Sequence, residues 1–188
     1  MSVDMKPEAS SDIINLPPQE EMLAAVGRAL QIFAMVETSV SFVYASLMQP
    51  ADRNSSLITL EAARHIKTKV AIVDAVASYV LVEDTLKKWK SLKNEVDSRE
   101  RTRNKIVHST VSYWPGIKSA AQLRKVKVAL VPIPSYRGWA QAMYGGRKDK
   151  QSKVMLLKDL KRFHDQCTRL NNELIELSID IGNSRPKT

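Results

Sequence analysis

Cysteine, histidine and glycine are scarce in this chain, and their scarcity excludes several classes of protein. The single cysteine, Cys167, excludes an intramolecular disulfide and is typical of a reduced cytoplasmic protein. With 1 Cys and 3 His among 188 residues and no HExxH or CxxC pattern, the sequence predicts no metal site and no cofactor. The 6 Gly and the aromatic content of 6% favour helices over sandwiches or barrels.

Long apolar runs and a leader sequence are also missing. No stretch approaches the roughly 20 apolar residues that cross a bilayer, and the first residues lack the basic and apolar layout of a signal peptide. Positive charge is in excess, since 29 Lys and Arg against 20 Asp and Glu give a net charge of +9. That charge favours polyanionic partners such as RNA, DNA or anionic lipid. We expect a cytoplasmic protein that does not enter a membrane.

The length of the chain suits one domain with a single core and is short for two. Residues 1–17 are polar and have no apolar period, so we expect a flexible N-terminal arm there. Residues 18–182 form the expected helical domain, and Gly182 marks the end of its last helix. Residues 183–188 remain as a short C-terminal tail.

Apolar residues recur at helical spacing in four long segments of the chain. They predict helices between Pro18 and Pro50 and over about 57–80, 83–108 and 153–181. Between the last two helices this period vanishes, and residues 111–114 and 126–133 have the pattern of two short strands. We therefore expect a mostly α-helical fold, an up-and-down four-helix bundle with a small β-hairpin inserted before the last long helix.

Two charged residues interrupt the apolar faces of these helices. In the first helix a carboxylate, Glu37, stands where the series predicts an apolar side chain. In the third helix, at 100° per residue, Arg103 falls in the middle of an inward stripe that consists of Trp89, Leu92, Val96 and Val107. The other basic residues of this helix are expected to point mostly outward: Lys87, Lys88, Lys90, Lys93, Arg99 and Arg101.

The motif R-N-K-I-V-H, residues 103–108, closes the third helix and is followed by Ser109. Asn104 and His108 are four residues apart and lie on neighbouring faces. Arg103 and His108 point roughly 140° apart on an ideal helix. The three side chains can converge if the helix unwinds near His108, or if a two-fold partner supplies the second half of the site.

The residue types of this motif suit the cleavage of RNA without a metal ion, because RNA carries its own nucleophile, the 2′-hydroxyl. His108 suits proton transfer, since an imidazole has an ordinary pKa of about 6.5. Arg103 suits the phosphate, because a guanidinium can hold two of its oxygens. Asn104 can orient either the imidazole or the phosphate.

The motif resembles the R-x4-6-H motif of the HEPN superfamily. The order of helices over residues 19–181 fits as well, although only residues 103–108 carry an identifiable motif. HEPN domains are small helical bundles that commonly dimerise, and many are metal-independent endoribonucleases in toxin–antitoxin, abortive-infection and other defence systems. The resemblance implies that Arg103 and His108 are catalytic with Asn104 as their polar neighbour. It also implies RNA as substrate, a homodimer, and an antitoxin or other partner protein.

Other interpretations of these residues stay open. Arg103 and His108 can be a helix-end pair, with the arginine bound to Glu37 or Glu100 and the histidine near the carbonyl end of the helix dipole. Glu37, and with it Ser109, can support the site, or Glu37 can lie at the edge of its stripe and reach water. The motif can also belong to a non-catalytic HEPN-like module that binds RNA or protein, or to a purely helical scaffold.

A basic run before the last helix is a weaker candidate for RNA binding. Its cations can follow an RNA backbone, and nearby aromatic side chains can stack on bases. The aromatic residues are Tyr136, Trp139 and Tyr144, and the cations are Arg147, Lys148, Lys150 and Lys153, with the run continuing into the last helix at Lys158, Lys161 and Arg162. The alternative is a solvated helix face beside a packed loop. The pair Gly145 and Gly146 lacks the frame of a phosphate-binding loop.

Overall fold

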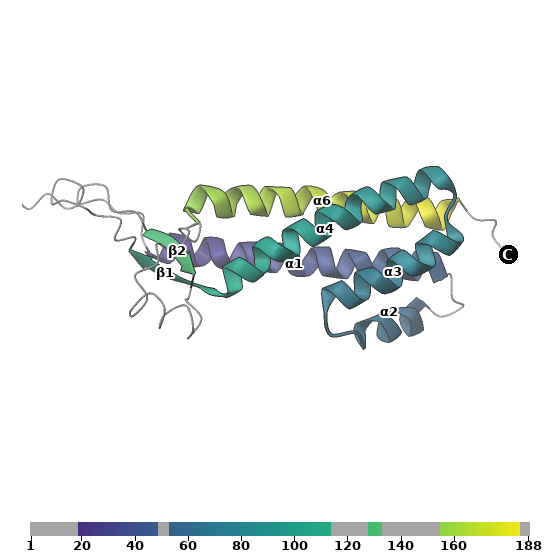
Figure 1. Cartoon of the computed structure of the whole chain (residues 1–188), viewed down its shortest axis with the longest axis horizontal. Helices are drawn as coiled ribbons and strands as arrows, with labels where there is room; N and C mark the ends of the chain where they lie inside the picture. Colours follow the sequence, from purple (N-terminus) through teal and green to yellow (C-terminus); the bar gives the residue numbers. More distant parts are fainter. Residues whose placement is uncertain (1–18, 49–52, 114–127, 133–154, 185–188) are drawn as a thin grey trace, which may run out of the picture.

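The computed structural model describes residues 19–48, 53–113, 128–132 and 155–184, and these are mostly α-helical, as predicted. They form five helices and two short strands (Figure 1). The elements in chain order are α1 (Gln19–Met48), α2 (Arg53–Glu61), α3 (Ile66–Val80), α4 (Glu83–Val107), β1 (Ser109–Tyr113), β2 (Val128–Pro132) and α6 (Leu157–Asn183).

The helices alternate in direction along the chain, so that α1, α3 and α6 run one way and α2 and α4 run the other (Figure 1). The hydrogen bonds between α1 and α6 also show that these two helices run in the same direction. Ser39 bonds to Asn171 and Ser46 bonds to Ser178, and each pair is separated by 132 residues. A constant separation means that the two helices run in parallel.

The single helix that was predicted over 57–80 is wrong, because the chain breaks there into α2 and α3. A polar contact explains the break. The carboxylate of Glu61, at the end of α2, accepts hydrogen bonds from Lys69 Nζ and from Ser41 Oγ of α1. In an unbroken helix, Glu61 and Lys69 would be about 12 Å apart along the axis. The described residues therefore form five helices instead of four, and α1 lies parallel to α6 instead of antiparallel.

The core lies along α1 and α6, which are covered by α3 and α4. The predicted inward face of α6 is buried throughout its centre, at Leu160, Phe163, Cys167, Leu170, Leu174 and Leu177. On α4, the predicted residues Trp89, Leu92 and Val96 are buried, but Val107 is 43% exposed and Ile106 is buried instead. Near this end of α4 the core includes Leu130 of β2, and the buried face has shifted by one residue to meet it.

The strands β1 and β2 pair antiparallel, with Ser109 opposite Pro132. Leu130 also forms a bridge with Met155, just before α6. The residues that connect the two strands lie outside the described residues. The same holds for the N-terminal arm and for the basic and aromatic candidates of the loop before α6, which are Tyr136, Trp139, Tyr144, Arg147, Lys148, Lys150 and Lys153.

Helix α1 is long and apolar enough to cross a membrane by length and composition, contrary to what the sequence analysis expected. More than half of its most apolar window is buried against the other helices, at 56%. The core helix of a bundle passes the same test of length and composition.

The contact between Ser39 and Asn171 gives a first test of the packing of α1 on α6. Both side chains are buried, and Ser39 Oγ donates to Asn171 Oδ1 at 2.7 Å. Asn171→Ala leaves a buried hydroxyl without its partner, so we expect the free energy of unfolding to fall by about 1–3 kcal/mol. The exposed neighbour Asn172 provides the control, since Asn172→Ala has the same effect on helix propensity. Equal stability of the two variants in urea unfolding would contradict this prediction.

Candidate functional site

The last turns of α4 hold Arg103 in a network of polar side chains. Arg103 is half-buried on the face of α4 that meets the core, and its Nη1 donates to Asn104 Oδ1 at 3.1 Å. The amide of Asn104 in turn donates to Glu100 Oε1 at 3.4 Å. Glu100 is only 8% exposed, and Lys67 Nζ of α3 lies 3.8 Å from its Oε2. We call Glu37, Glu100, Arg103 and Asn104 the Arg103 cluster.

Glu37 brings α1 into the Arg103 cluster. Burial raises the pKa of its carboxyl above the ordinary 4.5, and the charges of Glu61 and Glu100 act in the same direction. The positive charges of Arg103 and Lys69 oppose this rise without cancelling it. Glu37 therefore lies within electrostatic reach of Arg103, although among the described residues no hydrogen bond or ion pair joins the two side chains. Its assignment as a supporting residue stays a prediction.

His108 lies where α4 ends. The helix stops at Val107, and His108 has φ −93° and ψ 28° while its backbone N–H still donates to Asn104 O at 3.0 Å. Its side chain is exposed. Within the part of the chain that the structure describes, no hydrogen bond or ion pair joins this imidazole to Arg103 or Asn104. Within one chain, Arg103 and Asn104 thus lie together while His108 is at the surface. The helix does end at His108, but this does not bring the imidazole to the other two side chains.

Ser109 fastens the end of α4, because its Oγ donates to Lys105 O at 2.5 Å. This hydrogen bond keeps a carbonyl of the last turn satisfied, and it fixes the direction in which the chain leaves the helix toward β1. The assignment of Ser109 as a supporting residue of the site stays a prediction.

The other groups that often carry chemistry are not assembled into a site among the described residues. There, no three His, Cys, Asp or Glu side chains are grouped so that they could hold a metal ion. Burial raises the pKa of the Cys167 thiol to about 12, so this cysteine is a packing residue and not a nucleophile at neutral pH.

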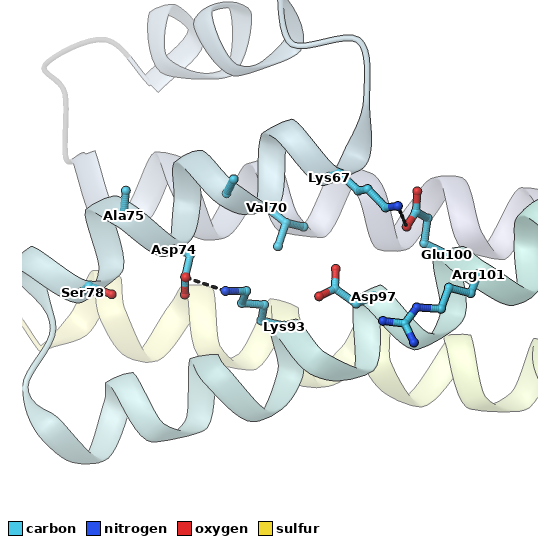
Figure 2. Close-up of a pocket in the computed structure, with 10 residues that line it drawn as sticks. Lys67, Val70, Asp74, Ala75, Ser78, Lys93, Asp97, Glu100 and Arg101 are labelled. Carbon is cyan, nitrogen blue, oxygen red and sulfur yellow. Dashed lines mark hydrogen bonds and ion pairs between the residues drawn. The ribbon is translucent and has the colours of Figure 1, made fainter.

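A groove of about 420 Å³ runs between α3 and α4 beside the Arg103 cluster, and the two share Glu100. Figure 2 shows that Lys67 reaches Glu100, and that Lys93 reaches Asp74 from the opposite wall. Three cations and three carboxylates line this groove, so their charges balance. The α3–α4 groove therefore has no net preference for an anion or a cation.

Lys69 was not predicted from the sequence as a neighbour of this cluster, and its side chain is buried beside it. The residue is 7% exposed, bonds to Glu61 and acts electrostatically on Glu37. A signal was present, because Lys69 follows Ile66 by three residues and precedes Val73 by four, and both are buried. A lysine at that position belongs to the apolar face of its helix, where a cation needs a partner.

Comparisons of the chain with protein-family models, with curated proteins and with solved structures found no match. The resemblance to HEPN domains therefore depends on the motif at 103–108 and on the order of the helices. Family membership stays an expectation, and function is inferred from the chemistry of the residues described above.

The raised pKa of Glu37 predicts how pH affects stability. Between pH 4.5 and the higher pKa of the folded state, the folded chain binds more protons than the unfolded chain, so stability falls as pH rises through this window. Glu37→Gln removes this charge, and we expect it to raise the free energy of unfolding at pH 7 but not below pH 4.5. Unfolding in urea at several pH values measures the difference. The exposed Glu176→Gln serves as the control.

A Glu37→Gln variant less stable than the wild type at pH 7 would contradict this prediction. It would mean that the attraction of Glu37 to Arg103 and Lys69 outweighs the cost of burying its charge.

Proposed function

We propose that the protein is a metal-independent endoribonuclease of the HEPN type, which acts as a homodimer in the cytoplasm. The observation that carries the proposal is a cation, Arg103, kept half-buried on the inward face of α4 and oriented by Asn104, five residues before an exposed histidine at the helix end. A toxin–antitoxin or phage-defence setting, with an antitoxin or other partner protein, follows from the resemblance to HEPN domains. We also infer that β1 and β2 belong to the hairpin inserted before α6.

Each residue of the motif has a role in the proposed reaction. The 2′-oxygen of RNA forms a bond to phosphorus while the bond to the leaving 5′-oxygen breaks. His108 takes the proton of the 2′-hydroxyl or gives a proton to the 5′-oxygen, and water takes part in the other transfer, so that a 2′,3′-cyclic phosphate and a free 5′-hydroxyl result. Arg103 stabilises the negative charge on the phosphate, and Asn104 orients Arg103 through the bond at 3.1 Å.

The different directions of the two main residues support the proposal of a homodimer. Arg103 faces the interior of the bundle while His108 is exposed at the end of the same helix. A second copy related by a two-fold axis can bring its own His108 to the Arg103 of the first copy, and the reverse, because a two-fold interface repeats every contact. Each dimer would then hold two equivalent sites.

A non-catalytic module that binds RNA or protein is the second candidate. The hydrogen bonds of Arg103 favour this candidate. Its Nη1 donates to Asn104, and Asn104 donates to the buried Glu100. Such a network can be entirely structural and can fix the end of α4 for a binding surface. This candidate predicts salt-sensitive RNA binding without cleavage products.

The experiment that tests the proposal incubates the purified protein with single-stranded and structured RNA in EDTA, beside His108→Ala and His164→Ala. EDTA removes the activity of contaminating metal-dependent nucleases. We expect the wild type and His164→Ala to cleave RNA and His108→Ala not to do so, since His164 lies on α6 away from the motif. Cleavage by all three proteins, or by none of them, would contradict the assignment of His108.

A further inference from the structure

A pocket of about 330 Å³ lies between α4 and α6, at the end of the bundle that carries β1 and β2 (Figure 1). We call it the α4–α6 pocket. Its volume is several times the roughly 30 Å³ that one water molecule occupies in the liquid. The polar residues that line it are Arg99, Thr102, Lys105, Asp159, Arg162 and Gln166.

The charges around the α4–α6 pocket do not balance. Three cations and one carboxylate, Asp159, line the pocket, and Asp159 Oδ2 already accepts the backbone N–H of Leu156 at 2.9 Å. Arg99 is paired with Glu95, which also pairs with Arg169, so the excess positive charge comes mainly from Lys105 and Arg162. The α3–α4 groove differs, because its cations and carboxylates are equal in number and several are paired. An uncompensated positive charge attracts anions, and the low dielectric of a pocket strengthens that attraction.

Arg99 is the fixed donor of this pocket. The sequence analysis expected it to point outward, but its side chain is only 19% exposed. Its Nη1 donates to Gln166 Oε1 at 2.7 Å and its Nη2 to Glu95 Oε1 at 3.3 Å. Among the described residues, its buried Nε has no hydrogen-bond partner. The guanidinium is thus held in place while part of its bonding capacity remains unused.

Lys105 and Arg162 supply exposed charge to the lining of the pocket, one from each helix. Both are exposed, and neither has an ion-pair partner in the described ranges. Gln166 adds a further donor, since its Oε1 is occupied by Arg99 and its amide nitrogen remains to donate elsewhere. A fixed guanidinium, two exposed cations and an amide form a donor set that suits the oxygens of a phosphate group.

One lining residue of the α4–α6 pocket, Lys105, is close in sequence to the candidate catalytic residue. Lys105 precedes His108 by three residues at the end of α4, and residues at that spacing are neighbours on the surface of a helix. A chain of phosphates that passes His108 can therefore place another of its phosphates at Lys105 and in the pocket.

We propose that the α4–α6 pocket binds a backbone phosphate of single-stranded RNA next to the phosphate that reacts at His108. The inference depends on the proposed function for the identity of the polyanion and for the reaction at His108. Inorganic phosphate is the other source of the same chemistry, and the experiment distinguishes the two. The pocket would hold the strand in register, which is a task for protein groups that do not read the bases.

The test measures the affinity for a labelled single-stranded oligoribonucleotide in EDTA, with His108→Ala as the parent so that the RNA stays intact. Two pocket variants are compared with this parent. Lys105→Ala/Arg162→Ala removes two charges, and Gln166→Glu adds a carboxylate while keeping the oxygen that Arg99 binds. Arg28→Ala/Lys87→Ala is the control, because it removes one exposed Arg and one exposed Lys outside the pocket.

We expect both pocket variants to raise Kd about tenfold and the control to raise it less than about threefold. The double pocket variant should also lower the slope of log Kd against log salt by about 0.7 for each phosphate that the protein no longer neutralises. An equal rise of Kd in the control, or no RNA binding by the parent, would overturn the proposal. Inorganic phosphate that binds as tightly as the oligoribonucleotide would overturn the assignment to RNA.

These outcomes are separate from those of the cleavage experiment. If the wild type does not cleave RNA but the pocket variants alone weaken binding, the catalytic proposal fails and the phosphate pocket stands. If the wild type cleaves RNA but the pocket variants bind as the control does, the pocket fails and the catalytic proposal stands.

Discussion

Arg103→Lys is expected to slow RNA cleavage by about 100-fold or more while the bundle stays folded. Removing one donor that stabilises the charge of a transition state costs about 10²–10³ in rate. Lysine keeps the positive charge near Glu37 but lacks the planar fork that can hold two phosphate oxygens and bond to Asn104 at once. The rate of cleavage under single-turnover conditions measures this effect, with circular dichroism as the check on folding.

Arg101→Lys is the matched control for this substitution. Arg101 is exposed on the same helix and lines the α3–α4 groove, so the change is chemically the same but leaves the bond between Arg103 and Asn104 in place. We expect the control to cleave RNA at nearly the rate of the wild type. If Arg103→Lys were as active as Arg101→Lys, the guanidinium of Arg103 would be a structural group, and the non-catalytic module would be the better explanation.

Trp89→Ala is expected to have the largest effect on stability, with a loss of about 3–5 kcal/mol in the free energy of unfolding. The indole is fully buried, and its Nε1 donates to Asp74 Oδ1 at 3.0 Å. Burial raises the pKa of Asp74, but the hydrogen bonds from Lys93 and Trp89 outweigh it and hold the pKa below 3.8. The substitution therefore opens a cavity and also removes one of the donors that stabilise this carboxylate.

Thermal unfolding measures the loss, which corresponds to a fall in Tm of roughly 10 °C for a domain of this size. Lys87→Ala at an exposed position of the same helix should change Tm by no more than about 1–2 °C. A Trp89→Ala protein as stable as Lys87→Ala would show that α4 does not pack on the bundle through this face.

The sequence predicted the long helices because their apolar faces are periodic, and α6 shows this most clearly. It could not predict the break between α2 and α3, since the segment 62–65 contains neither Gly nor Pro and His65 caps α3 without a side-chain hydrogen bond. What favours the break is the meeting of Glu61 with Lys69 and Ser41, which depends on the packing of three helices. Contacts between residues of different helices leave no signal in the sequence around the break.

The same distinction applies to the candidate site. The half-burial of Arg103 and the different direction of His108 follow from helical geometry alone, and both were predictable. The hydrogen bond from Asn104 to Glu100 could not be predicted from the sequence, because several possible acceptors lay within one turn of Asn104. Arg99 was predicted to lie on the outer face of α4, but α6 packs against it and Gln166 accepts its hydrogen bond. The periodicity of α4 alone cannot show where α6 packs.

The sharpest test of a site shared between two copies mixes two inactive chains, Arg103→Lys and His108→Ala, and follows RNA cleavage in EDTA. If each site combines Arg103 of one copy with His108 of the other, half of the dimers are mixed and hold one intact site each. We then expect about a quarter of the wild-type activity after the subunits exchange. A mixture no more active than the two variants alone would contradict the composite site at Arg103 and His108.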